Sequence, residues 1–255
     1  MNKLAGHTFL AKLGKKRLRP GGIKATRFLL DQVELTSTTK ILEVGCNMGT
    51  SAIELLKKYK DIKIIACDID EDALNIARSN AFKAGVSNRI SFIHSDATDL
   101  IFEANTFDVI INEAMLTMLN STKKDLAIKN YFKILKPGGV LLTHDVLLKT
   151  DDERIKKEVI ADLSREIMVH VSPLTLIGWQ ALFIEHGFSD VKSKIGHMSL
   201  LSPIGLVRDE GFLGAFKIIR NGLSKQHKDR FKRLFNVFRK HKKQIGYIAN
   251  ASFKI

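Results

Sequence analysis

The stretch ILEVGCNMGT, residues 41–50, decides the fold expected of this chain of 255 residues. Its apolar run Ile41–Val44 includes one acid, Glu43, and passes directly into a glycine turn. A helical pattern of apolar residues begins at Thr50. A strand, a glycine turn and a helix in immediate succession predict the first unit of an open α/β sheet, whose turn cradles a nucleotide-like ligand.

The glycine spacing narrows the kind of ligand. A dinucleotide fingerprint needs glycines at positions 47 and 50, where Asn47 and Thr50 stand, and the Gly-Lys-Ser/Thr end of a P-loop is absent from the turn. What remains is Glu43, two residues before Gly45, with Gly49 at the end of the turn. Asparagine tolerates a left-handed backbone better than other non-glycine residues, so the turn can form at position 47. Alone, the stretch is equally compatible with an ordinary strand-to-helix turn.

Composition is that of a globular protein. A hydrophobic content of 45% and a charged content of 27% over 255 residues suit one α/β domain with additional helices. Residues 1–20 lack the continuous apolar segment of a signal peptide, and the sequence contains no apolar run long enough for a membrane span. Cys46 and Cys67 fall at predicted buried strand ends and suggest neither a disulfide framework nor a metal site, so we expect a cytoplasmic protein without a metal.

The chain is strongly basic, with a formal net charge of +14. Such a balance favours an anionic partner, which could be RNA, an acidic membrane surface or an acidic substrate. It also serves solubility, and the charge by itself does not choose among these roles.

Acids follow the second and third predicted strands. The strand at residues 62–68 ends in Asp68, 19 residues after Gly49, where a carboxylate can accept both hydroxyls of a ribose. Asp70 is better placed to cap the helix that begins at Glu71. The strand at residues 88–94 is followed by Asp96, whose alternative role is an Asx turn.

Two further strands end in polar residues. Residues 107–112 form a strand that passes into Asn112-Glu113-Ala114-Met115, and residues 140–146 form another that contains His144 and Asp145. The turn Lys136–Gly139, with the sequence KPGG, precedes the latter strand. The carboxyl ends of parallel strands form the ligand-binding edge of such sheets, so we expect these side chains near the ligand.

These motifs, in this order over roughly residues 40–147, resemble those of the class I S-adenosylmethionine-dependent methyltransferases. The turn resembles the family's E/D-x-G-x-G-x-G motif with Asn47 in place of the middle glycine, and LKPGGVLL matches the family's phrase before the fifth strand. The likeness is greatest to the small-molecule group that includes ubiquinone/menaquinone-biosynthesis methyltransferases. It implies a Rossmann-like α/β three-layer sandwich with a seven-stranded, mostly parallel sheet and an antiparallel last strand.

The resemblance also implies the cofactor S-adenosylmethionine and its ligands. Asp68 would bind the ribose hydroxyls, Ile69 would pack on the adenine, and Asp96 with the backbone N–H of Ala97 would read the adenine edge. The full set of cofactor-binding candidates is Glu43, Gly45, Asn47, Gly49, Asp68, Ile69, Asp96, Ala97 and Asn112.

The reaction implied is methyl transfer to an O, N, S or C nucleophile of a small molecule. Glu113, His144 and Asp145 are the candidates for a general base, although each taken singly is more often a structural residue. Methyltransferases that modify nucleobase amines carry an N/D-P-P-Y/F tetrad where this chain has Asn-Glu-Ala-Met, which argues against a nucleobase amine as acceptor. Met115 and Met118 predict an apolar floor for a small organic substrate, or core packing with equal weight.

The flanking segments are predicted to be helical. Residues 3–17 and 23–33 read as amphipathic helices, the first with a basic end at Lys15–Arg17. Covering the cofactor end of the sheet, they would place Arg17 or Arg19 near an anionic substrate group. We therefore expect residues 1–36 to form an N-terminal cap.

The remaining boundaries follow from the last strand, which the apolar segment 245–253 predicts. Residues 37–198 would form the cofactor-binding core, residues 199–243 a helical lid inserted before the last strand, and residues 244–255 the strand that completes the sheet.

Residues 224–243 predict a strongly basic amphipathic helix with phenylalanines on one side. Its apolar stripe could pack on the core as part of the lid, which we favour. It could instead lie on an anionic membrane and receive a lipophilic substrate. Nucleic-acid binding is the least favoured, because the aromatic residues share the apolar face.

Two other functions remain open. The basic charge fits an RNA-modifying methyltransferase, although the chain shows no recognisable RNA-binding domain. The replacement of a glycine by Asn47 fits a non-catalytic module that only binds S-adenosylmethionine. The sequence indicates a small-molecule acceptor, anionic or lipophilic, and does not indicate an oligomeric state.

Overall fold

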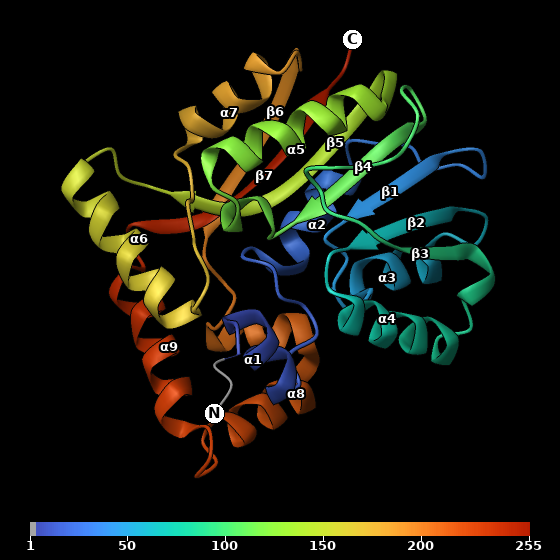
Figure 1. Ribbon diagram of the computed structural model, residues 1–255. Coiled ribbons are helices and arrows are strands. Elements are labelled where there is room, and N and C mark those ends of the chain that lie inside the picture. The colour runs from blue at the N-terminus through green and yellow to red at the C-terminus, as the bar shows by residue number, and fades with distance from the viewer. Residues whose placement is uncertain (1–3) are drawn as a thin grey trace.

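A mixed sheet of seven strands forms the centre of the computed structural model, which describes residues 4–255, in the order β3-β2-β1-β4-β5-β7-β6 (Figure 1). Neighbouring strands from β3 to β5 are parallel, and β7 runs antiparallel to both β5 and β6. This order confirms the predicted Rossmann-like fold. The strands are β1 Lys40–Val44, β2 Lys63–Asp68, β3 Ile90–His94, β4 Phe107–Glu113, β5 Leu135–Leu148, β6 Asp190–His197 and β7 Ile245–Phe253.

Helices cover both faces of the sheet. One apolar cluster joins it to α2, α3 and α4, and a second joins it to α5 and α7. The helices are α1 Gly6–Leu13, α2 Gly22–Leu30, α3 Thr50–Lys58, α4 Glu71–Lys83, α5 Ser121–Ile134, α6 Glu153–Ile167, α7 Leu176–Glu185, α8 Pro203–Gly222 and α9 Lys228–Lys240, with short 3-10 turns η1 Ser87–Arg89 and η2 Leu116–Met118.

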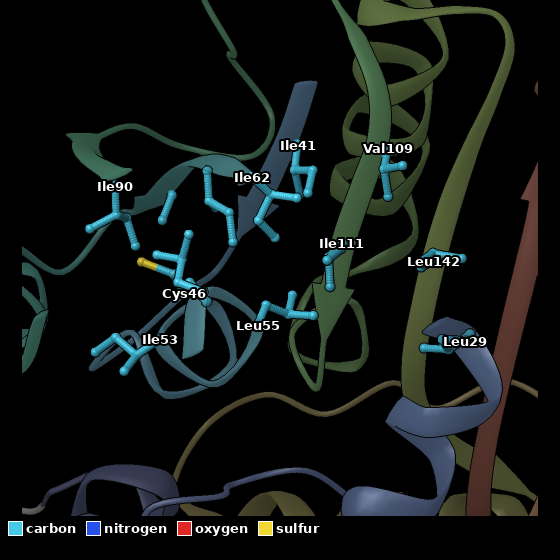
Figure 2. Packing of buried hydrophobic residues seen from close by; sticks show 14 of the residues in the cluster. Leu29, Ile41, Cys46, Ile53, Leu55, Ile62, Ile90, Val109, Ile111 and Leu142 are labelled. Carbon is cyan, nitrogen blue, oxygen red and sulfur yellow. The ribbon is translucent and has the colours of Figure 1, made fainter. Parts of the chain in front are cut away.

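The central strands are buried on both faces, which explains their continuous apolar sequences. Figure 2 shows side chains of the first cluster, where Ile111 of β4 lies next to Leu55 of α3 and Ile41 of β1 lies farther along the sheet. The alternate residues Leu42 and Val44 belong to the cluster on the opposite face. The opening stretch therefore anchors the apolar packing on both sides of the sheet.

A third apolar cluster lies beyond the carboxyl ends of β1 and β4, where α1, α6, α8 and α9 gather (Figure 1). Leu13 of α1, Leu163 of α6, Ile218 of α8 and Leu234 of α9 are almost fully buried there. None of the helices between residues 4 and 255 is long and apolar enough to cross a membrane.

The first helix is shorter than the sequence predicts. It ends at Leu13 because Gly14 adopts a left-handed conformation with φ of 106° and terminates it. The prediction that the helix extends to a basic end at Lys15–Arg17 is therefore wrong. Lys15 is buried and lies 3.4 Å from the carboxylate of Glu210 in α8. Residue 3, the predicted start of this helix, lies outside the described residues.

The basic helix predicted at residues 224–243 is α9, and its apolar side is buried. Phe231, Leu234 and Val237 pack into the third cluster. Their burial favours the packing interpretation of the stripe over exposure to lipid or nucleic acid. The preceding helix α8 is interrupted at Gly211, whose φ of 74° and ψ of 170° are non-helical.

An ion-pair network joins α6 to α9. The ammonium of Lys240 lies 2.7 Å from both Glu158 and Asp162, and the Nε2 atom of His241 lies 2.9 Å from Asp162. Glu158, Asp162 and His241 have the spacing of metal ligands. Because Lys240 already supplies the cation between the two carboxylates, we interpret the group as a structural network.

Candidate functional site

An open cleft of about 360 Å³ lies at the carboxyl ends of β1, β2 and β4. Its volume is within the range of small-molecule and cofactor sites. The structure brings together most of the predicted cofactor residues in its wall, which includes Gly45, Asn47, Asp68, Ile69, Asp96 and Ala97.

The turn after β1 lines this cleft with left-handed backbone. Gly45, Asn47 and Gly49 all have positive φ, at 74°, 47° and 72°. The left-handed conformation predicted for Asn47 is confirmed. A Cβ atom at Gly45 would lie 3.0 Å from the Cγ atom of Met115, so a side chain at this position would crowd Met115 in the cleft wall.

Asp68 is held at the tip of β2 by backbone N–H groups. Its Oδ2 atom accepts from Asn47, at 2.7 Å, and its Oδ1 atom accepts from Asp70, at 3.0 Å. Asp70 itself caps α4 by accepting from the N–H of Ala73, as predicted. Next to Asp68, the side chain of Ile69 is 64% exposed, which leaves an apolar surface at the cleft.

Asp96 projects from the loop after β3. Its Oδ1 atom accepts from both the backbone and the hydroxyl of Thr98, each at 2.8 Å. The backbone hydrogen bond from Thr98 contributes most to lowering the pKa of Asp96, so this carboxylate stays ionised at neutral pH. Its anchoring by Oδ1 leaves Oδ2 as the oxygen available to a ligand.

Three predicted cofactor residues lie outside the wall of this cleft. Glu43 is buried under the turn and accepts from the N–H of Ala52 at 3.1 Å. Burial, followed by the charge of Glu113, raises the pKa of Glu43 to about 8. Asn112 is fully buried and donates to the carbonyl of Val44 at 3.3 Å, and Gly49 precedes the first residue of α3.

Glu113 lines the cleft, but its carboxylate is already heavily hydrogen-bonded. Arg19 and Ser51 donate to Oε2 at 2.6 and 2.7 Å, and Thr26 donates to Oε1 at 2.6 Å. Burial tends to raise the pKa of Glu113, but the Arg19 charge and the hydrogen bonds from His144 and Thr26 outweigh it and hold this pKa well below its usual range. Glu113 is therefore a weak proton acceptor that fixes the N-terminal segment to the sheet.

His144 is fully buried, and both of its ring nitrogens have partners. The N–H of Gly21 donates to Nε2 at 2.8 Å, so Nε2 must carry the lone pair. The proton therefore lies on Nδ1, which donates to Glu113 at 3.0 Å. In this arrangement His144 has no free lone pair with which to receive a proton from a substrate.

Asp145 lies at the boundary between the sheet and a largely apolar cavity. Its oxygens accept from the backbone N–H groups of Thr117, at 3.1 Å, and Val146, at 2.7 Å. Burial raises the pKa of Asp145. Of the three general-base candidates, Asp145 is the one that lines this apolar cavity.

The apolar cavity adjoins the cleft. His7, Leu18, Ala114 and Met118 line both of them, so the two spaces meet at these side chains. The outer wall comes from the third apolar cluster and includes Leu163, Val171, Met198, Leu200, Leu234 and Phe238. The cavity has a volume of about 70 Å³, so a ligand in the cleft and a small apolar group in the cavity would be neighbours.

His7 is a residue that the sequence analysis did not identify. It lies on α1 at the junction of the cleft and the cavity, and its Nδ1 atom is buried without a hydrogen-bond partner among residues 4–255. Burial lowers the pKa of His7, against the opposing charges of Asp68 and Asp70, so its imidazole is neutral at physiological pH. The signal in the sequence is a polar residue three positions before Leu10 and six before Leu13, on the same helix face as these buried leucines.

The cleft suits a nucleoside with an additional polar tail. Asp68 and Asp96 present carboxylates that can accept from hydroxyl and amine groups, and Ile69 offers an apolar surface for a base. The open backbone at Gly45 allows close approach of a ligand without a side chain in between. These features fit S-adenosylmethionine.

Comparison with known proteins also indicates a methyltransferase. A family model described as "Methyltransferase domain" matches residues 41–139. An uncharacterized protein of Haemophilus influenzae is 45% identical, covering 98% of each chain. Phosphoethanolamine N-methyltransferase 1 of Triticum aestivum is 31% identical over 52% of this chain, and the UbiE ubiquinone/menaquinone biosynthesis C-methyltransferase of Saccharophagus degradans is 33% identical over 46%.

The matches to the two methyltransferases are partial. The matched region spans 26% of the wheat protein and 46% of the UbiE protein. Among solved structures, a putative sarcosine dimethylglycine methyltransferase from Galdieria sulphuraria superposes with a TM-score of 0.76, covering 97% of each chain at 17% identity. The structural likeness shows a shared fold.

Proposed function

We propose that this chain, which belongs to the class I S-adenosylmethionine-dependent methyltransferases, methylates a small molecule whose apolar part occupies the cavity beneath α1, α6 and α9. The observation that carries the proposal is the shared wall of cleft and cavity, formed by His7, Leu18, Ala114 and Met118. A cofactor in the cleft and an acceptor in the cavity would meet there, screened from water by the third apolar cluster.

The proposed cofactor ligands are the residues that line the cleft. Asp68 would bind the ribose hydroxyls, Asp96 and Ala97 the adenine edge, and the turn at Gly45 the amino-acid tail. When bound, S-adenosylmethionine supplies an electrophilic methyl group on a positively charged sulfur. The enzyme's own contribution is to orient the two ligands, to exclude water and to accept a proton where the acceptor carries one.

We assign the proton acceptor to His7. Its unpartnered Nδ1 atom lies where the two spaces meet, and its lowered pKa keeps it neutral. His7 would accept the proton released by the acceptor's O–H, N–H or C–H group. The electron pair of that acceptor atom would form the bond to the methyl carbon, and the electron pair of the broken carbon–sulfur bond would stay on sulfur. Glu113 and His144 are less suitable because their polar atoms are already engaged.

The names of the relatives do not identify the acceptor atom. One relative is an N-methyltransferase of phosphoethanolamine and another is a C-methyltransferase of quinone biosynthesis. The acceptor must therefore be inferred from the cavity of this chain, whose wall is mostly apolar with His7 and Asp145 as its titratable groups among the described residues.

Replacing Asp68 with alanine tests the cofactor site. We expect the affinity for S-adenosylmethionine to fall by about 1.5–3 kcal/mol, roughly 10–150-fold, because the charge-assisted hydrogen bonds to the ribose are lost. Titration calorimetry with S-adenosylmethionine measures this loss directly.

The matched control is Asp61→Ala, which removes an exposed acid just before the other end of β2. It should leave the affinity unchanged. Equal affinities for wild type and Asp68→Ala would remove Asp68 from the cofactor site. Failure of the wild type to form S-adenosylhomocysteine with every acceptor in a panel of apolar metabolites would count against the proposed activity.

We also propose that an anionic membrane surface is the partner of α8. Phe212 and Leu213 are 77% and 83% exposed, and the neighbouring Lys217 and Arg220 are also exposed. Exposed apolar side chains next to cations favour an anionic lipid surface. The sequence leaves a membrane contact open for residues 224–243, but the apolar side chains of that helix pack inward. The same inward packing leaves α9 without an aromatic platform for nucleic-acid bases.

Vesicle sedimentation tests this contact. The wild type should co-sediment with vesicles of phosphatidylcholine and phosphatidylglycerol, and weakly with phosphatidylcholine alone. Replacing both Phe212 and Leu213 with serine should abolish co-sedimentation, because it removes the exposed apolar area. Unchanged co-sedimentation of that variant would show that α8 is not the contact.

A further inference from the structure

A second large cleft lies on the far side of the apolar cavity. It has a volume of about 500 Å³ and is lined by four cationic side chains from separate elements and by His197 of β6. The cations are Lys24 of α2, Arg208 of α8, Arg239 of α9 and Lys242 after α9. We call it the basic cleft. Residues that are far apart in the sequence therefore line the same basic cleft.

The cations of the basic cleft are poorly neutralised. No carboxylate of residues 4–255 lines it. Arg208 is held by Asp209, at 3.1 Å, and by the hydroxyl of Ser199, at 2.9 Å. Lys24, Arg239 and Lys242 take part in no ion pair within the described part of the chain. Gathering like charges costs free energy, which an anionic ligand would recover.

The basic cleft continues into the apolar cavity. Met198 and Phe238 line both of them. The apolar cavity, with a volume of about 70 Å³, therefore adjoins the cofactor cleft at His7 and the basic cleft at Met198 and Phe238. A single elongated molecule could place its reacting atom at His7, its apolar body in the cavity and a charged group among the cations.

We propose that the basic cleft binds a phosphate monoester group carried by the methyl acceptor. A phosphate bears about −1.5 to −2 charges at neutral pH and suits several converging cations better than a single carboxylate does. Arg208, already oriented by Asp209 and Ser199, offers a fixed guanidinium, while Lys24, Arg239 and Lys242 supply mobile charge. The inference rests on the proposed function in that it takes the apolar cavity to be the acceptor site.

Hexyl phosphate, hexanoate, 1-hexanol and inorganic phosphate serve as probes, each titrated by calorimetry into the protein saturated with S-adenosylhomocysteine. Hexyl phosphate should bind best, with an affinity that falls as salt is raised. The double variant Arg239→Gln/Lys242→Gln should bind it about tenfold more weakly and should bind 1-hexanol as the wild type does. Lys24→Gln, on a different helix, should weaken hexyl phosphate in the same direction.

The control variant is Lys83→Gln on α4, an exposed lysine outside all three spaces. It should bind hexyl phosphate like the wild type. The proposal is overturned if hexyl phosphate binds no better than 1-hexanol or hexanoate, if inorganic phosphate alone binds equally well, or if the double variant and Lys24→Gln both retain full affinity.

Failure of this inference is distinguishable from failure of the proposed function. Binding of S-adenosylhomocysteine is measured separately, before the probes are added. A protein that binds S-adenosylhomocysteine and treats hexyl phosphate like 1-hexanol keeps its cofactor site and loses the phosphate subsite. A protein that does not bind S-adenosylhomocysteine loses the proposed function.

Discussion

Replacing His7 with glutamine is expected to lower kcat by about 10²–10⁴-fold, the usual contribution of a positioned general base. Glutamine keeps a polar side chain on α1 but cannot accept a proton. The reason for choosing His7 is its position, because it lines both the cofactor cleft and the apolar cavity with a buried, unpartnered Nδ1 atom. The measurement is S-adenosylhomocysteine formation at saturating cofactor, with the first acceptor found in the metabolite panel.

The pH dependence of the same reaction gives a second readout. His7 accepts a proton only when it is neutral, and burial lowers its pKa below the ordinary histidine value. In the wild type, kcat should therefore rise as pH increases through this lowered pKa and then level off, with the rise lying below the pH expected for an ordinary histidine. In His7→Gln this rising limb should disappear.

His170→Gln is the matched control, since His170 is exposed and lies outside the site. Its kcat and pH profile should equal those of the wild type, and all variants should bind S-adenosylmethionine alike. A His7→Gln enzyme with wild-type kcat and an unchanged pH profile would show that the acceptor needs no proton transfer to His7.

Replacing Glu113 with alanine is expected to lower the free energy of unfolding by about 3–5 kcal/mol, because it leaves a buried charge without its main partner. That charge is Arg19, 4% exposed in its side chain and 2.6 Å from Glu113. Ser51, Thr26 and His144 would lose their acceptor in the same step. Equilibrium unfolding in urea gives the difference.

Two further variants distinguish the loss of the Glu113–Arg19 interaction from the general effect of shortening a glutamate side chain. Glu103→Ala removes an exposed glutamate and should change the free energy of unfolding little. The double variant Glu113→Ala/Arg19→Met should lose less than the sum of its single variants, because it removes both buried charges together. Additive losses would show that the two residues stabilise the fold independently.

The interactions of Glu113 with Arg19, His144 and Thr26 also predict that the free energy of unfolding decreases at acid pH. Because the pKa of Glu113 is depressed in the folded state, its contribution is present above the ordinary glutamate pKa and is lost as pH falls towards the depressed value. Glu113→Gln should lack this part of the acid dependence. An identical acid dependence in both proteins would assign the loss of stability to other groups.

The sequence alone predicts those parts of the site that follow from local geometry. Asp68 and Asp96 lie at strand tips, and strand tips of a parallel sheet share one edge, so their place in the cleft follows from the order of the strands. The left-handed turn at Asn47 likewise depends on a few neighbouring residues. These features need no knowledge of distant packing.

The roles of Glu113 and His144 could not be predicted in this way. Their partners Arg19 and Gly21 lie 94 and 123 residues earlier in the chain. A pattern of residues near a strand tip gives no indication that an N-terminal segment occupies them. His7 was missed for the same reason, because its importance arises only where α1 meets the sheet.

In the first helix, the helix-ending effect of Gly14 outweighs the apolar periodicity that predicts a longer helix. The periodic apolar residues suggested a helix to position 17, but Gly14 ends it. The chain then turns so that Glu210 accepts from the N–H groups of Lys16 and Arg17, at 3.1 and 2.9 Å. The last basic residues thus serve a tertiary contact, which their sequence spacing does not reveal.

The position of α8 and α9 between two paired strands has a consequence for how such a chain can diversify. The chain leaves the sheet after His197 and re-enters it at Ile245, and His197 lies opposite Gly246 in the β6–β7 ladder. Because the cost of closing a loop grows slowly with its length, a graft of foreign sequence between these points need not disturb the sheet. The graft would, however, need a matching N-terminal segment, because the carboxylates of Glu210 and Asp209 in α8 accept hydrogen bonds from the N–H groups of Lys16 and Ile23. A working exchange of α8 and α9 would therefore have to replace the N-terminal segment that contacts them at the same time.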